Sequence, residues 1–471
     1  MDARRLKELE QGRERNPVYH REVDGLFRFL VPAGSRVLEL GCGTGRLLAS
    51  LAPVTGLGID VDERKIEAAR DLHRGVAGLE FRSGDAGKVD WTGIQPFDYI
   101  LLSDLLPLLP DVQATLSSLA PVCTPGTRLV LQYHSNLWRP VLDAATTLGW
   151  REHTPDYSWL SRTDVANLLA LASYQVVTVG GRTLLPARVP GVEALVNGLL
   201  ARLPLFQLLT LTQYTVARPL PAPLPVTGPE APSVSVVVPA RNEKGNIEAA
   251  FLRTPAMGRW TELLFIDGDS SDGTYEEIER CIKKHGRRFK RCVLERQTGK
   301  GKGQAVRQAF ARAKGDVLMI LDSDLTMPPE ELPKYYGALV EGKGELINGC
   351  RLVYPMEGRA MRFLNMVANH GFGKVFTWLM GQPVKDTLCG TKVLWRRDYE
   401  TLAANRSYFG EFDPFGDFDL LFGASRLNRK IVDMPIRYKD RTYGDTKISR
   451  FRHGLLLARM CVVAFRKLKL S

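Results

Sequence analysis

The sequence lacks paired cysteines. Its seven cysteines are an odd number spread over 471 residues, and no two of them form a CxxC pair. This spacing argues against a disulfide framework and against the common zinc-ligand patterns, so we expect reduced, mostly buried thiols. They are Cys42, Cys123, Cys281, Cys292, Cys350, Cys389 and Cys461.

Long uninterrupted apolar runs are also missing. Residues 196–217 are apolar and long enough to span a bilayer, but Arg202, Pro204, Gln207 and Gln213 interrupt them, so we predict a helix followed by a strand.

The first residues, MDARRLKELEQGRERN, have no apolar core of the kind that a secretory signal requires, and we expect a cytoplasmic protein. No internal repeat is visible. Hydrophobic and charged fractions of 44% and 25% are those of a globular chain.

Acidic residues are scarce near the C-terminus. From Arg426 onward there are 13 Lys or Arg and 3 Asp or Glu, which gives +10 of the chain's net charge of +12. This excess predicts an anionic partner, either nucleotide phosphate or membrane phosphate, with a solvated basic face as the alternative. Residues 454–465 are apolar and flanked by basic residues; they predict a helix at a lipid surface or one packed on its own domain. No recognition motif accompanies the charge, so we expect no nucleic-acid partner.

A proline-rich segment divides the chain. Residues 218–232 hold six prolines in fifteen positions, which favours an extended spacer. We therefore predict domains at residues 1–218 and 233–471, joined by a linker at 219–232. In both, short Val/Ile/Leu runs alternate with amphipathic segments, so we predict two α/β domains of the Rossmann-like, three-layer αβα class. Strands are predicted at residues 36–40, 55–59, 97–102, 127–132, 234–238, 262–266, 316–321 and 431–436.

The first predicted strand runs into a glycine-rich loop at residues 41–45, GCGTG, just before a helix that begins near Arg46. Glycines allow a ligand close to the backbone, and the helix N-terminus leaves N–H groups free to bind it. The spacing is GxGxG, whereas a nicotinamide fingerprint requires GxGxxG. Asp60 ends the next strand, where a carboxylate accepts ribose hydroxyls. Asp85 follows a third strand and is positioned to accept from an adenine amino group.

The motifs VLELGCGTG, GIDVD and SGDA, taken together, resemble the class I S-adenosylmethionine-dependent methyltransferases over about residues 20–218. The resemblance implies the class I methyltransferase fold and S-adenosyl-L-methionine as cofactor. It also places Ser103 and Asp104, in FDYILLSDLLPLLPD, near the transferred methyl group. The implied cofactor-binding residues are Glu39, Gly41, Gly43, Gly45, Asp60, Asp85 and Ser103.

The methyl acceptor is not evident from the sequence. Methyl transfer requires orientation and only sometimes a base. Tyr133, His134 and Trp138 follow the fifth strand, where we expect an acceptor to bind, and His134 is either a base or a structural residue. The alternative is that this half binds S-adenosylmethionine, or acts as a scaffold, without catalysis.

In the C-terminal half, carboxylates follow three predicted strands. Glu243 lies in the polar turn after the first, Asp267 follows the second, and Asp322 and Asp324 follow VLMIL. Acidic groups at adjacent strand ends suit a base and a ribose. Mg²⁺ typically keeps one or two carboxylates plus substrate phosphates, and such a metal offsets the charge of a departing diphosphate. On the DxD pattern alone, a structural role is an equal alternative.

The segments VVVPARNE, DSSDGT, GKGQAVRQAF, LDSDLTMPPEELP and DRTYGDTK resemble glycosyltransferase family 2, over about residues 233–450, and within it the dolichol-phosphate mannosyltransferase branch. The resemblance implies a GT-A fold, an inverting reaction, a nucleoside-diphosphate sugar and Mg²⁺ or Mn²⁺ at Asp322 and Asp324. The whole layout, including DTLCGTK and FDPFGDFDLLFGA, also resembles fused methyltransferase/glycosyltransferase proteins. The implied nucleotide-sugar-binding residues are Pro239, Glu243, Asp267, Gly301, Asp322, Arg441 and Lys447.

Two positions depart from that branch. It usually has adjacent aspartates where this chain has Asp267 and Gly268, and a glutamine where Thr326 follows the metal motif. Donor preference and metal affinity are therefore open, and Asp269 is an alternative position for the first carboxylate.

Two glycosyl acceptors are compatible with the sequence. A hydroxyl requires a base to activate it, and Asp417 in FGDFDL lies where many family members keep one, although an acidic helix start is also a common cap. A polyprenyl phosphate is already anionic and requires cations instead. Arg351 and Arg362 match phosphate-contact regions of the polyprenyl-phosphate enzymes, and the alternative is that they are surface or fold residues. The predicted catalytic residues are Asp324, Asp417, Arg351 and Arg362.

Our primary hypothesis is a bifunctional methyltransferase/glycosyltransferase, peripheral on the cytoplasmic face of a membrane. It transfers a hexose to a polyprenyl phosphate or related glycolipid and methylates an unidentified acceptor. The alternative is glycosyl transfer to a hydroxyl with Asp417 as base.

Overall fold

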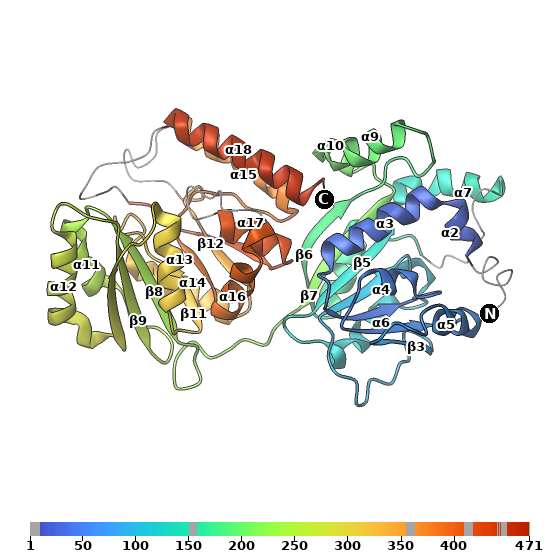
Figure 1. Cartoon of the computed structure of the whole chain (residues 1–471), viewed down its shortest axis with the longest axis horizontal. Coiled ribbons are helices and arrows are strands. Elements are labelled where there is room, and N and C mark those ends of the chain that lie inside the picture. The colour runs from blue at the N-terminus through green and yellow to red at the C-terminus, as the bar shows by residue number, and fades with distance from the viewer. Residues whose placement is uncertain are drawn as a thin grey trace. The chain divides into compact units, whose positions relative to one another are not determined.

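The structure, a computed structural model, describes residues 10–149, 158–354, 363–408, 418–439, 441, 443 and 450–470. Two compact units account for them, one of Met1–Leu220 with Leu470–Ser471 and one of Pro221–Lys469. Each unit contains a seven-stranded sheet with helices on its faces (Figure 1).

The sheet of the first unit has the order β3-β2-β1-β4-β5-β7-β6. The strands β1 to β5 are parallel to their neighbours, and β7 is antiparallel to both β5 and β6. Because β1 lies between β2 and β4, the carboxyl ends of these three strands meet at one edge. The strands are β1 (Arg36–Leu40), β2 (Thr55–Asp60), β3 (Leu79–Ser83), β4 (Tyr99–Ser103), β5 (Arg128–His134), β6 (Tyr174–Gly181) and β7 (Thr212–Pro219).

Side chains alternate between the two faces of this sheet, and each face buries an apolar layer. Leu38, Leu102 and Leu131 pack with residues of α6 and α8, whereas Val37, Leu101 and Val130 pack with residues of α3, α4 and α5. The unit is therefore a three-layer αβα domain. The helices are α2 (Gln11–Arg15), α3 (Pro17–Leu30), α4 (Arg46–Ser50), α5 (Glu63–Leu72), α6 (Val112–Ser118), α7 (Arg139–Thr147), α8 (Arg162–Leu171), α9 (Val192–Gly198) and α10 (Pro204–Gln207).

The sheet of the second unit has the order β10-β9-β8-β11-β13-β12-β14. The strands β10, β9, β8 and β11 are parallel, while β13 is antiparallel to β11 and β12. The carboxyl ends of β9, β8 and β11 thus lie side by side. The strands are β8 (Val234–Ala240), β9 (Thr261–Asp267), β10 (Arg291–Arg296), β11 (Val317–Ile320), β12 (Leu346–Cys350), β13 (Lys392–Trp395) and β14 (Ile431–Pro435).

The helices of this unit also form two layers. Val236, Phe265 and Met319 pack with residues of α11, α12 and α14, and α13 lies against β8 and β9. The helices are α11 (Lys244–Arg253), α12 (Thr274–His285), α13 (Lys302–Arg312), α14 (Leu332–Val340), α15 (Phe363–Met380), α16 (Arg396–Ala404), α17 (Phe418–Arg426) and α18 (Arg450–Leu468). The two α/β sheets confirm the predicted fold class, and each of the eight predicted strands coincides with an observed one to within two residues.

The predicted helix before β7 is divided. Pro204 cannot continue a helix that precedes it, and α9, a 3-10 turn at Leu200–Arg202 and α10 follow one another. At the other end of the chain, α18 packs on α15, with the rings of Trp378 and Phe465 5.5 Å apart. No described helix is both long enough and apolar enough to cross a bilayer. All seven cysteines are free thiols, as predicted.

Candidate functional site

The glycine loop of the first unit lies where β1 ends. Gly41, Gly43 and Gly45 all have positive φ, and a Cβ on Gly45 would stand 2.4 Å from the Phe81 ring, so only glycine fits there. A Cβ on Gly43 would meet nothing within 4 Å, which shows open space over the loop. At the end of β2, Asp60 Oδ2 accepts from Gly43 N at 2.8 Å. The loop and this carboxylate therefore form one cradle at the carboxyl edge of the sheet.

Glu39 lies beneath the loop rather than in it. It is 2% exposed, and its Oε2 accepts from Leu48 N at 3.0 Å. Burial raises the pKa of Glu39 to about 8. Asp85 is half-exposed in the loop after β3, where it accepts from Gly87 N at 3.0 Å.

A polar cluster lies at the ends of β4 and β5. Asp104 adopts φ +51° and accepts from Tyr19 Oη at 2.6 Å and from Gln132 Nε2 at 2.9 Å. His134 Nε2 is 3.6 Å from Asp104 Oδ1. Ser103 Oγ donates to Gln132 Oε1 at 3.0 Å. A strained backbone and several bonds on one carboxylate are typical of a functional position.

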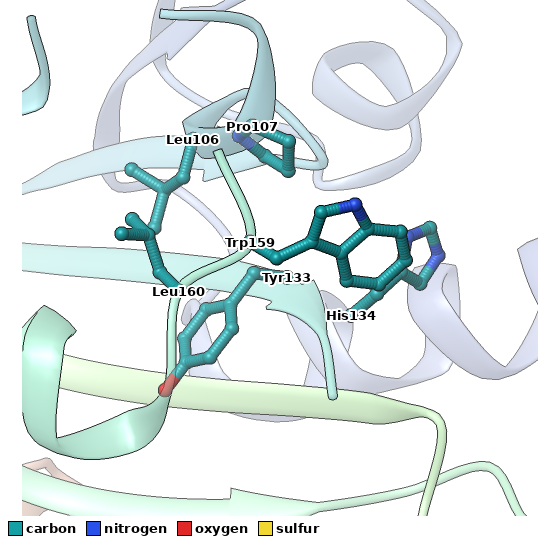
Figure 2. A pocket seen from close by; sticks show the side chains of 6 residues that line it. All are labelled: Leu106, Pro107, Tyr133, His134, Trp159 and Leu160. Carbon is teal, nitrogen blue, oxygen red and sulfur yellow. The ribbon is translucent and has the colours of Figure 1, made fainter. Parts of the chain in front are cut away.

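A small pocket lies beside this cluster, with a cavity volume of about 10 Å³. Its lining is Leu106, Pro107, Tyr133, His134, Trp159 and Leu160. Figure 2 shows the Trp159 indole next to His134, with the Leu106 and Leu160 side chains facing each other. The pocket therefore offers an apolar surface and one imidazole.

In the second unit, the carboxylates that the sequence singled out lie along the edge formed by β9, β8 and β11. Ala240 pairs with Asp267, and Val237 pairs with Ile320, so the loops after these strands are neighbours. Asp267 is fully buried, and its Oδ1 meets no donor among the described residues. An acceptor left unpaired at a strand end suits a ligand N–H. Asp269, by contrast, is exposed, with φ +60°.

Basic side chains neutralise both carboxylates of the DxD motif. Lys302 Nζ is 2.5 Å from Asp322 Oδ1, and Arg441 Nη2 is 2.6 Å from Asp324 Oδ2. Burial alone would raise the pKa of Asp322, but the Lys302 ammonium outweighs it and holds this pKa below its ordinary value. Arg441 also approaches Glu243 Oε1, at 3.6 Å. The two carboxylates thus stand in one charged cluster.

This cluster fits a divalent cation that also binds substrate phosphates. Among the described residues no group of three or more His, Cys, Asp or Glu side chains is arranged to hold a metal. Two carboxylates are enough for Mg²⁺ when phosphates complete its shell. Thr326, the departure from the usual glutamine, fixes one of them: its N and Oγ1 donate to Asp324 Oδ1 at 3.1 and 2.8 Å.

Arg351 is held in a buried ion pair. Its Nε and Nη2 donate to the two carboxylate oxygens of Asp386 at 2.7 and 2.8 Å, and its guanidinium lies 5.3 Å from the Tyr438 ring centre. Burial opposes its charge, but Asp386 keeps the pKa of Arg351 above its ordinary value. If Arg351 contacts a substrate phosphate, as the sequence predicts, it does so while it remains paired with Asp386.

The other predicted residues of this half are less informative. Pro239 is the second-to-last residue of β8, and Gly301, with φ +88°, precedes the first residue of α13. Asp417, Arg362 and Lys447 lie outside the described residues.

Sequence reasoning missed four residues of the two sites. Lys302 and Asp386 were within recognised segments, GKGQAVRQAF and DTLCGTK, but single residues there carry no signal of which carboxylate or cation they meet. Tyr19 and Gln132 lie 113 residues apart and meet only through packing of α3 on the sheet. The one available signal was a glutamine inside an otherwise largely apolar run, RLVLQYH.

Two family models match the chain. Residues 32–159 match a family described as "Methyltransferase domain", and residues 235–402 match "Glycosyl transferase family 2".

Curated relatives match the second half. The undecaprenyl-phosphate 4-deoxy-4-formamido-L-arabinose transferase of Klebsiella pneumoniae is 26% identical over 231 residues, which are 48% of this chain and 66% of that protein. The dolichol-phosphate mannosyltransferase of Pyrococcus furiosus is 28% identical over 223 residues, which are 46% of this chain and 59% of that protein. The chain thus spans less than two thirds of either relative.

Solved structures resemble each half. Magnesium protoporphyrin IX methyltransferase from Synechocystis, with bound SAH, is 18% identical with a TM-score of 0.31, covering 45% of this chain and 86% of its own. Glucosyl-3-phosphoglycerate synthase from Mycobacterium tuberculosis, in complex with Mn²⁺, uridine diphosphate and glucosyl-3-phosphoglycerate, is 20% identical with a TM-score of 0.37. It covers 51% of this chain and 81% of its own.

Proposed function

Because this chain joins a methyltransferase domain to a family 2 glycosyltransferase domain, we propose that it moves a hexose from a nucleoside-diphosphate sugar to a polyprenyl phosphate and methylates a related lipid-linked product. We assign the domains to residues 1–218 and 233–471, with 219–232 as linker. We place the protein peripherally on the cytoplasmic face of a membrane.

One observation carries the glycosyltransferase part of the proposal. Asp322 and Asp324 each form an ion pair with a basic side chain, at the sheet edge where Asp267 also lies. Lys302 and Arg441 are the positive charges next to these carboxylates, and binding of a metal and a diphosphate would rearrange both ion pairs. Asp322 and Asp324 would hold a divalent metal, which would supply positive charge to the leaving diphosphate. Asp267 and Glu243 then orient the nucleotide, and Arg441 holds the phosphates once it leaves Asp324.

The charge around the site and the names of two relatives support a polyprenyl phosphate as acceptor. Two relatives are named for transfer to polyprenyl-type phosphates. A phosphate oxygen is already anionic, so it attacks the sugar carbon from the face opposite the diphosphate without a base, and the carbon–oxygen bond to the diphosphate breaks with inversion. The basic C-terminal residues attract such an acceptor.

Lipid extraction tests this proposal. Radiolabelled nucleotide sugars are incubated with the full chain, polyprenyl phosphate and Mn²⁺ or Mg²⁺, and we expect label in the organic phase. Asp324→Asn should abolish this transfer, whereas Asp417→Asn should leave it intact. Label confined to water-soluble product, together with loss of transfer in Asp417→Asn, would favour a hydroxyl acceptor instead.

In the methyltransferase half we propose that the cradle of Gly41, Gly43, Gly45 and Asp60 binds S-adenosyl-L-methionine and that the acceptor enters the pocket beside His134. Asp104 orients His134, which takes the acceptor's proton as the acceptor bonds to the methyl carbon and the carbon–sulfur bond breaks. The positive charge thus passes from the sulfonium to the imidazolium. His134→Ala should keep S-adenosylmethionine binding in calorimetry and lose methyl transfer to the lipid product; equal turnover would exclude a base role.

A further inference from the structure

The segment at residues 189–209 of the first unit is apolar on its outer surface. It comprises α9, the 3-10 turn and α10, which Figure 1 shows in green beside each other at the surface of the sheet domain. Eight large apolar side chains in it are between 36% and 80% exposed. They are Val189, Val192, Leu195, Leu199, Leu205, Phe206, Leu208 and Leu209. Exposed apolar residues scattered singly are ordinary, but a cluster of this size marks an interaction site.

The polar side chains of the same segment point inward. Asn197 is 1% exposed; its Oδ1 accepts from Leu184 N and Leu185 N, and its Nδ2 donates to Leu185 O. Arg202 is buried and pairs with Glu22 at 3.3 Å. This arrangement reverses the usual amphipathic pattern, in which polar groups face water.

No charged side chain of the segment is exposed. Its two charged residues are Glu193 and Arg202, and Glu193 accepts from Val189 N while pairing with Arg21 at 3.3 Å. The exposed charges at its border are basic: Arg188 precedes it directly, and the Arg21 side chain is 57% exposed. An apolar surface bordered by arginines is complementary to an anionic lipid surface, where the arginines meet headgroups.

The segment adjoins the methyl-transfer pocket. Leu209 O accepts from Trp138 Nε1 at 2.7 Å, and Leu211 O accepts from Ser135 N at 2.8 Å. In the next pair, Thr212 lies opposite His134, which lines the pocket. A surface resting on lipid at this place would present the pocket to an acceptor that never leaves the bilayer.

We propose that residues 189–209 are a membrane-docking surface that seats the methyltransferase half on an anionic bilayer, with a lipid-linked molecule as methyl acceptor. The choice of acceptor rests on the proposed function; the docking surface does not. Neither α9 nor α10 is long enough to span a bilayer, so contact is limited to the interface.

Vesicle binding by the full chain tests the surface. Vesicles of phosphatidylcholine with a minor fraction of phosphatidylglycerol are sedimented with wild type and with the double variant Leu205→Gln/Leu208→Gln. We expect the partition coefficient to fall at least about tenfold, because two exposed leucines no longer enter the apolar region. The matched control Val54→Gln/Leu252→Gln removes two exposed apolar side chains elsewhere and should bind as wild type does.

A reporter separates this surface from the basic helix α18. Phe206→Trp places an indole in the segment, and its emission should shift to the blue on vesicles and be quenched by lipids brominated in the acyl chain. Unchanged emission, or equal partitioning of the double variant, would overturn the proposal. Self-association that the double variant abolishes, without any vesicle effect, would also overturn it in favour of contact between copies of the chain.

An assay of glycosyl transfer to detergent-dispersed polyprenyl phosphate distinguishes failure of the docking surface from failure of the proposed function. Vesicle binding requires no donor, acceptor or cofactor, so it tests the docking surface independently of the proposed function. The double variant should retain this transfer at the wild-type rate, and absence of transfer in wild type would contradict the proposed function alone.

Discussion

At the scale of single residues, basic side chains lie in the glycosyltransferase site where a metal would add positive charge. Lys302 lies against Asp322, and Arg441 lies against Asp324, so each carboxylate of the metal motif already has a counter-ion. Under the proposed function, a metal would displace Lys302 from Asp322, and the freed ammonium would then be available to the diphosphate. The pairing keeps two adjacent carboxylates from destabilising the ligand-free fold.

Replacement of this counter-ion is therefore expected to strengthen metal binding in the absence of nucleotide. Lys302→Met should bind Mn²⁺ about tenfold more tightly than wild type, because the cation no longer competes with an ammonium at 2.5 Å. Calorimetric titration with Mn²⁺ alone measures the effect. Lys300→Met, two residues away and exposed, is the control and should leave the affinity unchanged. Weaker binding by Lys302→Met would mean that Lys302 does not compete for the metal position.

Glu39 makes a second residue-scale prediction, on pH. Its folded pKa of about 8 lies above the ordinary value of 4.5, so the folded state holds a proton that the unfolded state has released. Stability from this group is complete below pH 4.5 and is lost as the pH rises through 8. Glu39→Gln removes the titration and keeps the acceptor for Leu48 N.

Thermal melting between pH 5 and 8 measures this contribution. The transition of the S-adenosylmethionine-binding half should fall with rising pH in wild type and fall less in Glu39→Gln, by up to a few kcal/mol in unfolding free energy. The exposed carboxyl of Glu80 provides the control, since Glu80→Gln should preserve the wild-type slope. Parallel slopes for Glu39→Gln and wild type would show that Glu39 is not protonated in the fold.

At the scale of elements, buried strands were the most predictable part of the fold. The run VLMI is apolar throughout because both faces of a parallel sheet are covered, and this signal survives without any tertiary information. The antiparallel strand β13, KVLW, is only four residues long, and β12, LINGC, carries an asparagine and a glycine, so neither was predicted. Asn348 belongs in its strand because its Nδ2 donates to Asp386 O and Asp433 Oδ1, partners that the local sequence does not reveal.

The same contrast holds for the candidate sites. Residues at strand ends, such as Asp60 and Asp322, were predictable because β1, β2 and β4, or β8, β9 and β11, must end at a common edge. Partners that belong to other elements could not be predicted in this way. Tyr19 of α3 donates to Asp104, and Lys302 at the start of α13 pairs with Asp322. The sequence period specifies the face of a helix but not which side chain across the sheet it meets.

Helix α8 gives an element-scale prediction. Ser161 caps its N-terminus: the hydroxyl accepts from Asp164 N, and the Asp164 carboxylate accepts from Ser161 N at 2.8 Å, which is a reciprocal capping box. Ser161→Ala should lower the stability of the first half by about 1 kcal/mol, measured by denaturant unfolding. Ser118→Ala, which also removes a helix hydroxyl but no N-cap, should cost less. An equal cost in both variants would show that the capping box adds nothing.

At the scale of the whole molecule, the chain contains two sheets, each with its own apolar layers and its own candidate site. We predict from its prolines that the linker is extended, so we expect the halves to unfold as separate cooperative units. Ligands that bind only one folded half should then stabilise only that half.

Calorimetric scanning of the full chain tests this independence through its ligands. At about a hundredfold excess over Kd, a ligand stabilises its folded half by about 2.7 kcal/mol, which for a half of this size raises Tm by roughly 5 °C or more. S-adenosylmethionine should therefore raise one transition, and uridine diphosphate with Mn²⁺ the other. Asp60→Ala should remove the first shift and keep the second, while Asp324→Ala should do the opposite, so each variant is the control for the other. A single transition that both ligands raise would instead show that the two halves fold as one unit, and binding at one cradle would then be coupled to the stability of the other.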